Sequence, residues 1–125
     1  MTSALIDLDG AFDVVTAFEC IHDLPYPVDV LATMRKLAKG DGHVVVMDEK
    51  VSKAFGGRGD DVERLMYGFS LFICLPDGMS HPDSAATGTV MRPSTLRDYA
   101  REAGFTDIEI LPIESDLWRF YRLNV

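Results

Sequence analysis

The stretch FDVVTAFECIHDLP, residues 12–25, decides the fold and raises the functional question. Its first half, Phe12–Phe18, is largely apolar on both faces and rich in β-branched side chains, which is typical of a strand in a parallel sheet covered by helices. The stretch then turns polar with Glu19, Cys20, His22 and Asp23. Ligands of open α/β sheets bind beyond the carboxyl ends of the strands, so these side chains are candidates for a site.

The residues that follow predict a β-α-β unit. A helix is expected from Pro27, because proline is tolerated in a first helical turn and an apolar stripe runs from Val30 to Ala38 with helical spacing. Gly40 or Gly42 is expected to end it. A second apolar strand, Val44–Met47, comes next, with Asp48 and Glu49 at its exit. The crossover between two such parallel strands should be right-handed.

Residues 52–93 predict an insertion made of a helix and a long loop. The apolar side chains of residues 61–74 favour a helix, although Gly68 and Ser70 weaken that prediction. Three prolines and two glycines between Leu75 and Pro93 predict an irregular loop. Long loops in compact domains are more often functional than decorative, so this insertion is expected to have a functional role.

The last third predicts a helix and an antiparallel hairpin. Ser94 is a suitable N-cap, and Gly104 followed by Phe105 suits a Schellman ending. Residues 107–114 and 117–123 alternate as strands, and Pro112 places the first of them at a sheet edge. Trp118 and its aromatic neighbours are expected in the core. The fold class is therefore α/β, with parallel strands and a C-terminal antiparallel hairpin, in a single domain of residues 1–125.

Composition narrows the class of protein. The chain has 125 residues, 47% hydrophobic and 26% charged, with a formal net charge of −8. An acidic surface argues against nucleic acid as a partner, and no apolar run approaches a membrane span of ~18 residues. The start is acidic and lacks the features of a secretory signal. Cys20 and Cys74 have no CxxC spacing, which suits reduced thiols and a cytoplasmic location.

Four segments, by their order and spacing, together resemble class I S-adenosylmethionine-dependent methyltransferases: FDVVTAFECIHDL, DVLATMRKLAKGDGHVVVMDE, PSTLRDYAREAGF and LWRFYRL. Three shorter stretches particularly resemble bacterial members that carry an N-terminal winged-helix segment and act on small molecules: ECIHD, RLMYGFSLF and GTVMRPSTL. The resemblance implies a Rossmann-like sheet in which this chain supplies strands four to seven, the sixth at the edge and the seventh inside. It also implies S-adenosylmethionine as cofactor.

The chain departs from that family where the cofactor loop should be. Members carry a glycine-rich loop after their first strand and an acidic residue at the end of the second. Only eleven residues precede Phe12 here, with Gly10 the sole glycine among them. The resemblance therefore implies the C-terminal half of a methyltransferase domain, with an incomplete cofactor site.

The resemblance assigns roles to the polar stretch and to the insertion. Ala17, Phe18 and Glu19 would pass the methionine portion of the cofactor, and Glu19 could accept from its ammonium group. His22 would lie near the transferred methyl group as a general base; alternatively, His22 and Asp23 only solvate or cap a loop. The insertion would supply substrate-binding residues, although the same side chains could instead pack on the sheet: Met66, Tyr67 and Phe72.

Other chemistries have less support from the sequence. Glu19, His22, Asp23, His81 and Asp83 could gather metal ligands, but they match no usual spacing, so no metal site is expected. No GxSxG elbow follows a strand, which argues against a serine hydrolase.

Two hypotheses for function remain open. The first is a methyltransferase acting on a small molecule, with the alternative that a separate polypeptide supplies its missing half. The second is an inactive remnant that acts as an oligomerising or binding module. Without a neighbouring first strand, Phe12–Phe18 would leave a bare apolar edge, so a homo-oligomer through this edge is expected.

Overall fold

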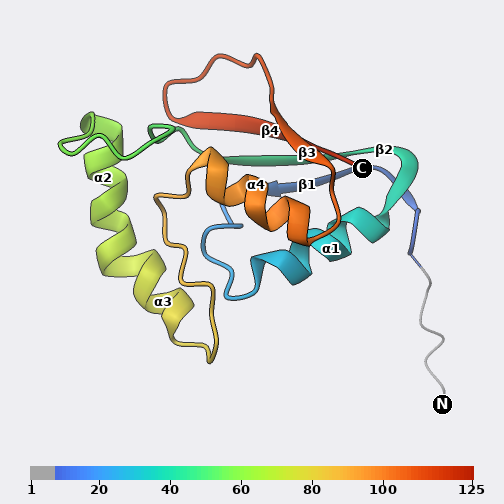
Figure 1. The fold of residues 1–125 in the computed structure, drawn as a ribbon, viewed down its shortest axis with the longest axis horizontal. Helices are drawn as coiled ribbons and strands as arrows, with labels where there is room; N and C mark the ends of the chain where they lie inside the picture. The colour runs from blue at the N-terminus through green and yellow to red at the C-terminus, as the bar shows by residue number, and fades with distance from the viewer. Residues whose placement is uncertain (1–7) are drawn as a thin grey trace.

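The two apolar stretches that open the chain form neighbouring strands of one four-stranded sheet (Figure 1). The computed structural model describes residues 8–125, and the strand order is β1-β2-β4-β3. The bounds of the strands are β1 Phe12–Phe18, β2 Ala38–Glu49, β3 Asp107–Ile110 and β4 Trp118–Asn124.

β1 and β2 are parallel and joined by helix α1, Pro27–Leu37, which confirms the predicted β-α-β unit. The helix ends before the two glycines expected to end it, because Ala38 is already extended, with φ −72° and ψ 141°. Gly42 instead allows the backbones of β1 and β2 to approach closely. A Cβ atom there would lie 3.0 Å from the carbonyl oxygen of Phe12, where the register between β1 and β2 is irregular.

The C-terminal hairpin also forms as predicted. β4 is antiparallel to both β2 and β3, and β3 lies at the edge of the sheet. Helix α4, Pro93–Glu102, starts two residues before the position expected from a Ser94 cap: its N-cap is Arg92, because Pro93 itself fits the first turn. The helix ends in a Schellman motif: Gly104 has φ +95°, and the Phe105 amide donates to the Ala100 carbonyl at 2.9 Å.

α1 and α4 lie side by side on one face of the sheet, and the core lies between this pair and the strands (Figure 1). The central buried side chains are Ala17, Leu31, Val44, Val46, Leu96, Ala100, Tyr121 and Leu123. β1 was expected to be buried on both faces. Instead, three of its side chains are exposed: Phe12 (42%), Val14 (53%) and Phe18 (53%). They are exposed because β1 is an end strand of the sheet and none of the described helices covers that face.

The insertion is more helical than predicted. α2, Asp61–Phe69, continues through a π-helical turn, η1 Ser70–Cys74, into α3, Leu75–Met79, where a loop was expected. This column of helices stands beyond the carboxyl ends of β1 and β2 (Figure 1). Among residues 8–125, no helix is both long and apolar enough to cross a bilayer.

Candidate functional site

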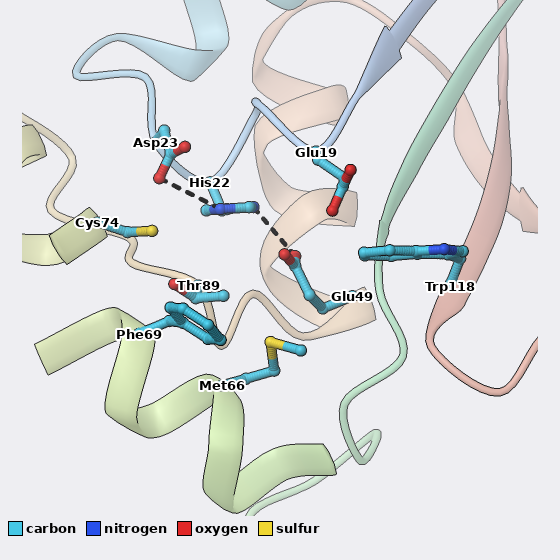
Figure 2. A pocket seen from close by; sticks show the side chains of 9 residues that line it. All are labelled: Glu19, His22, Asp23, Glu49, Met66, Phe69, Cys74, Thr89 and Trp118. Carbon is cyan, nitrogen blue, oxygen red and sulfur yellow. Dashed lines mark ion pairs between the residues drawn. The ribbon is translucent and has the colours of Figure 1, made fainter. Parts of the chain in front are cut away.

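A cavity of about 470 Å³ lies where β1 and β2 end and the α2–η1 column begins (Figure 2). Its walls combine carboxylates and one imidazole with apolar and aromatic side chains. The residues that line it are Glu19, His22, Asp23, Glu49, Met66, Phe69, Cys74, Thr89 and Trp118.

His22 is the centre of the polar wall. It lies on the turn after β1, is 4% exposed, and its Nδ1 is 2.7 Å from Asp48 Oδ1 and 3.2 Å from Glu49 Oε2. On its other side, Nε2 is 3.2 Å from Asp23 Oδ1. The sequence singled out His22 and Asp23 but gave no role to Asp48 and Glu49. Their position at the exit of the second strand was the available signal, because neighbouring parallel strands end at the same edge.

These contacts determine the protonation of the cluster. Burial alone would lower the pKa of His22, but its hydrogen bonds to Asp48 and Glu49 outweigh burial and raise that pKa to about 11. Burial raises the pKa of Asp48, and the hydrogen bond from His22 opposes that rise. The pKa of Glu49 is lowered to about 2: burial would raise it, and the hydrogen bond from His22 prevails. At neutral pH the cluster therefore holds an imidazolium beside at least one carboxylate.

Glu19 enters the cavity from a strained backbone position. Its φ is +50°, in the left-handed region, and its amide donates to the Met47 carbonyl at 2.9 Å. Strained residues of this kind cluster at functional sites. The two preceding residues expected to pass the cofactor do not line the cavity: Ala17 is buried in the core and Phe18 is exposed.

The insertion supplies an apolar wall, though not from all the residues predicted. Met66 is buried and lines the cavity together with Phe69. Tyr67 and Phe72 do not line it: the Tyr67 hydroxyl accepts a hydrogen bond from Arg92, and Phe72 is 79% exposed. Trp118 faces the cavity from β4, so its prediction as a core residue was wrong.

A buried ion pair fixes α2 against the rest of the domain. Arg92 donates from Nη2 to Glu63 Oε1 at 2.5 Å and from Nη1 to the Ser52 carbonyl at 2.6 Å. The Ser52 hydroxyl donates to Glu63 Oε2 at 2.8 Å, and Glu63 is 1% exposed. Sequence patterns do not reveal this network, because its members are distant in the chain. It holds the helix that carries Met66 and Phe69.

Three residues that line the cavity have buried oxygen atoms without a hydrogen-bond partner. Thr89 Oγ1 has none, and Glu49 Oε2 and Asp23 Oδ1 have only their ion pairs with His22. Buried polar groups rarely stay unpaired, so a bound molecule that donates hydrogen bonds would be stabilised here.

Two sets of side chains bring possible metal ligands within 4.8 Å of one another. One set is His22, Asp48 and Glu49, and the other is His22, Asp23 and Cys74. His81 and Asp83, which the sequence offered as ligands, belong to neither set. Both sets share His22, whose two nitrogen atoms already interact with carboxylates.

Comparisons with known proteins agree with this architecture. The sequence model of a family described as "Methyltransferase domain" matches residues 3–110, and the chain therefore belongs to that family. No curated protein sequence matches the chain.

Solved structures share the fold. The trans-methyltransferase CalH, in complex with SAH, is 21% identical with a TM-score of 0.61 over 93% of this chain and 30% of its own. The CMeT domain of the citrinin polyketide synthase is 10% identical, with a TM-score of 0.65 over 95% of this chain and 29% of its own. Human N-acetylserotonin methyltransferase, in complex with SAM, is 17% identical, with a TM-score of 0.62 over 90% of this chain and 29% of its own. The chain thus spans about 30% of the length of these proteins, and at this identity they show the fold alone.

Proposed function

We propose that the chain carries the acceptor side of an S-adenosylmethionine-dependent methyltransferase site that acts on a hydroxyl group of a small molecule. The observation that carries the proposal is the imidazole of His22, held by carboxylates in a cavity beyond the strand ends of a methyltransferase-family domain. Two structural neighbours, solved in complex with SAH or SAM, support the choice of cofactor.

The described residues fit one end of this cofactor. Glu19 presents a carboxylate to the cavity, where it can accept from an ammonium group such as that of the methionine portion. The cavity lining offers no glycine-rich loop for the nucleoside. When bound, the cofactor supplies an electrophilic methyl group on a sulfonium.

The chain's own residues then have two tasks. Met66 and Phe69 hold the apolar part of the acceptor in place, and alignment of the reacting atoms is the main source of rate in a direct displacement. His22 accepts the hydroxyl proton at Nε2 once that nitrogen is unprotonated and its 3.2 Å contact with Asp23 Oδ1 has opened to admit the hydroxyl. The carboxylates that raise its pKa make the neutral imidazole a stronger base, and they restrict this form to alkaline pH.

The test is transfer of a labelled methyl group from S-adenosylmethionine to the small phenols tyrosol and tyramine across a range of pH. We expect the rate to rise toward alkaline pH and to fall roughly 100-fold or more in His22→Gln, the scale of general base catalysis. Asp98→Asn, an exposed change on α4, is the matched control. Full activity in His22→Gln, or no transfer by the folded chain at any pH, would contradict the proposal.

A second candidate function is an oligomerising module without catalysis. The exposed side chains of β1 and its position at the end of the described sheet favour it, because a free strand edge pairs readily with another strand. A homodimer through β1 should be seen by light scattering, and Val14→Lys should make it monomeric. A wild-type monomer at tens of micromolar with a cooperative melt would rule this module out.

A further inference from the structure

The charge of the cavity restricts the molecule that it can accept. Three carboxylates line it, from Glu19, Asp23 and Glu49, and the imidazole of His22 is the single basic side chain in the lining. No lysine or arginine is among the residues that line it. Even with His22 protonated the wall is negative, so an anionic group would be repelled and a cationic group attracted.

The polar groups divide the cavity into two ends (Figure 2). Glu19 and Trp118 lie on one side of His22 and Glu49, and Asp23, Cys74 and Thr89 lie on the other. If Glu19 serves the cofactor, as proposed above, the negative charge of Asp23 belongs to the acceptor end.

An independent observation at the acceptor end also points to a ligand that donates hydrogen bonds. Thr89 is 2% exposed, lines the cavity, and its Oγ1 has no hydrogen-bond partner. Asp23 Oδ1 is buried and has only the 3.2 Å ion pair with His22. A ligand that brings N–H donors would satisfy these oxygens, whereas a carboxylate would leave them unpaired.

The remaining lining residues favour a ring. Phe69 and Met66 line the same cavity as Thr89 and Glu49 (Figure 2). The thioether and the aromatic ring provide an apolar surface on which an aromatic ring packs.

We infer that the acceptor is an aromatic amine bearing a hydroxyl group, whose ammonium lies at the Asp23–Thr89 end of the cavity. This substrate class rests on the proposed function for the role of the hydroxyl, but its binding does not require the cofactor. Phosphorylated and carboxylated acceptors are excluded by the same charge.

Three phenols that share a 4-hydroxyphenylethyl group test the inference: tyramine with an ammonium, tyrosol with a neutral hydroxyl, and 3-(4-hydroxyphenyl)propionate with a carboxylate. Trp118 is the one tryptophan in the chain and lines the cavity, so its fluorescence reports binding directly. The protein is titrated with each phenol at neutral pH, in the presence of a metal chelator and without cofactor. We expect tyramine to bind at least 10-fold tighter than tyrosol, and the propionate to bind weakest.

Charge variants test whether Asp23 causes the preference for tyramine over tyrosol. Asp23→Asn should reduce the advantage of tyramine over tyrosol several-fold, and Asp98→Asn should leave it unchanged. Circular dichroism checks that each variant is folded. If a variant is not folded, the titrations of the wild type with the three phenols test the inference without it.

Equal binding of the three phenols, tighter binding of the propionate, no binding of any, or binding only with added zinc would each overturn the inference. A parallel titration with S-adenosylhomocysteine separates the two proposals. Binding of S-adenosylhomocysteine without tyramine preference removes only the substrate class. Tyramine preference without S-adenosylhomocysteine binding removes only the methyltransferase site.

Discussion

Nδ1 of His22 lies 2.7 Å from Oδ1 of Asp48, although the two residues are 26 positions apart in the sequence. The contact exists because β1 and β2 are parallel neighbours, so that the turn after one strand meets the last residues of the other. Both side chains are almost fully buried. This pair, together with Glu49, sets the chemistry of the cavity.

The first prediction concerns the protonation of His22. Because its pKa is raised to about 11, both ring nitrogens should stay protonated well above neutral pH. Nitrogen-15 NMR of the histidine rings measures this, and His22→Gln assigns the resonance by its loss. Asp48→Asn should shift the titration to lower pH. A wild-type midpoint near the ordinary value would show that the carboxylates do not hold the proton.

The second prediction is a pH dependence of stability. The folded-state pKa of His22 is above its unfolded value of 6.5, so its stabilising contribution is complete below that pH and declines as pH rises toward about 11. The difference in unfolding free energy between the wild type and His22→Gln should therefore be larger near pH 6 than at about pH 10. Urea denaturation at both pH values measures it. A difference that grows with pH would have the wrong sign.

The third prediction concerns the ion pair that holds α2. Glu63 is 1% exposed and the Arg92 side chain 14%, so removing one partner leaves a buried charge without compensation. Glu63→Ala should lower the unfolding free energy by about 3 kcal/mol or more. The double variant with Arg92→Leu should cost less than the sum of the two single variants. Additive losses in urea denaturation would show that the two side chains act independently.

The fourth prediction concerns Gly88, which precedes the cavity residue Thr89. Its φ is +73°, and a Cβ atom there would lie 2.3 Å from Ser70 Oγ in the π-helical turn. Gly88→Ala should cost about 1–2 kcal/mol from the backbone conformation alone. It should also weaken tyramine binding by displacing Thr89. The control is Gly56→Ala, because nothing lies within 4 Å of a Cβ atom at Gly56.

Local patterns predicted the sheet and its helices well. The apolar stretch at β1, the proline at the start of α1 and the Gly104 ending each act through neighbouring residues, and each appears in the structure. The helix limits were less accurate. α1 ends at Leu37 rather than at a glycine, because the chain is already extended at Ala38, where β2 begins.

The site was predicted only in part, because its contacts join distant segments. His22 and Glu19 were found from their place at a strand end, and the cavity includes both. The partners of His22 come from β2, and sequence spacing does not show which atoms of two strands meet. On α2 the helical pattern did not separate Met66, which lines the cavity, from Tyr67, which does not.

Calorimetric titration of the purified chain with S-adenosylmethionine tests the central claim most directly. We expect saturable one-site binding that weakens in Glu19→Gln and is unchanged in Asp98→Asn. No heat up to millimolar cofactor, from a chain shown to be folded by circular dichroism, would contradict a methyltransferase site in this chain.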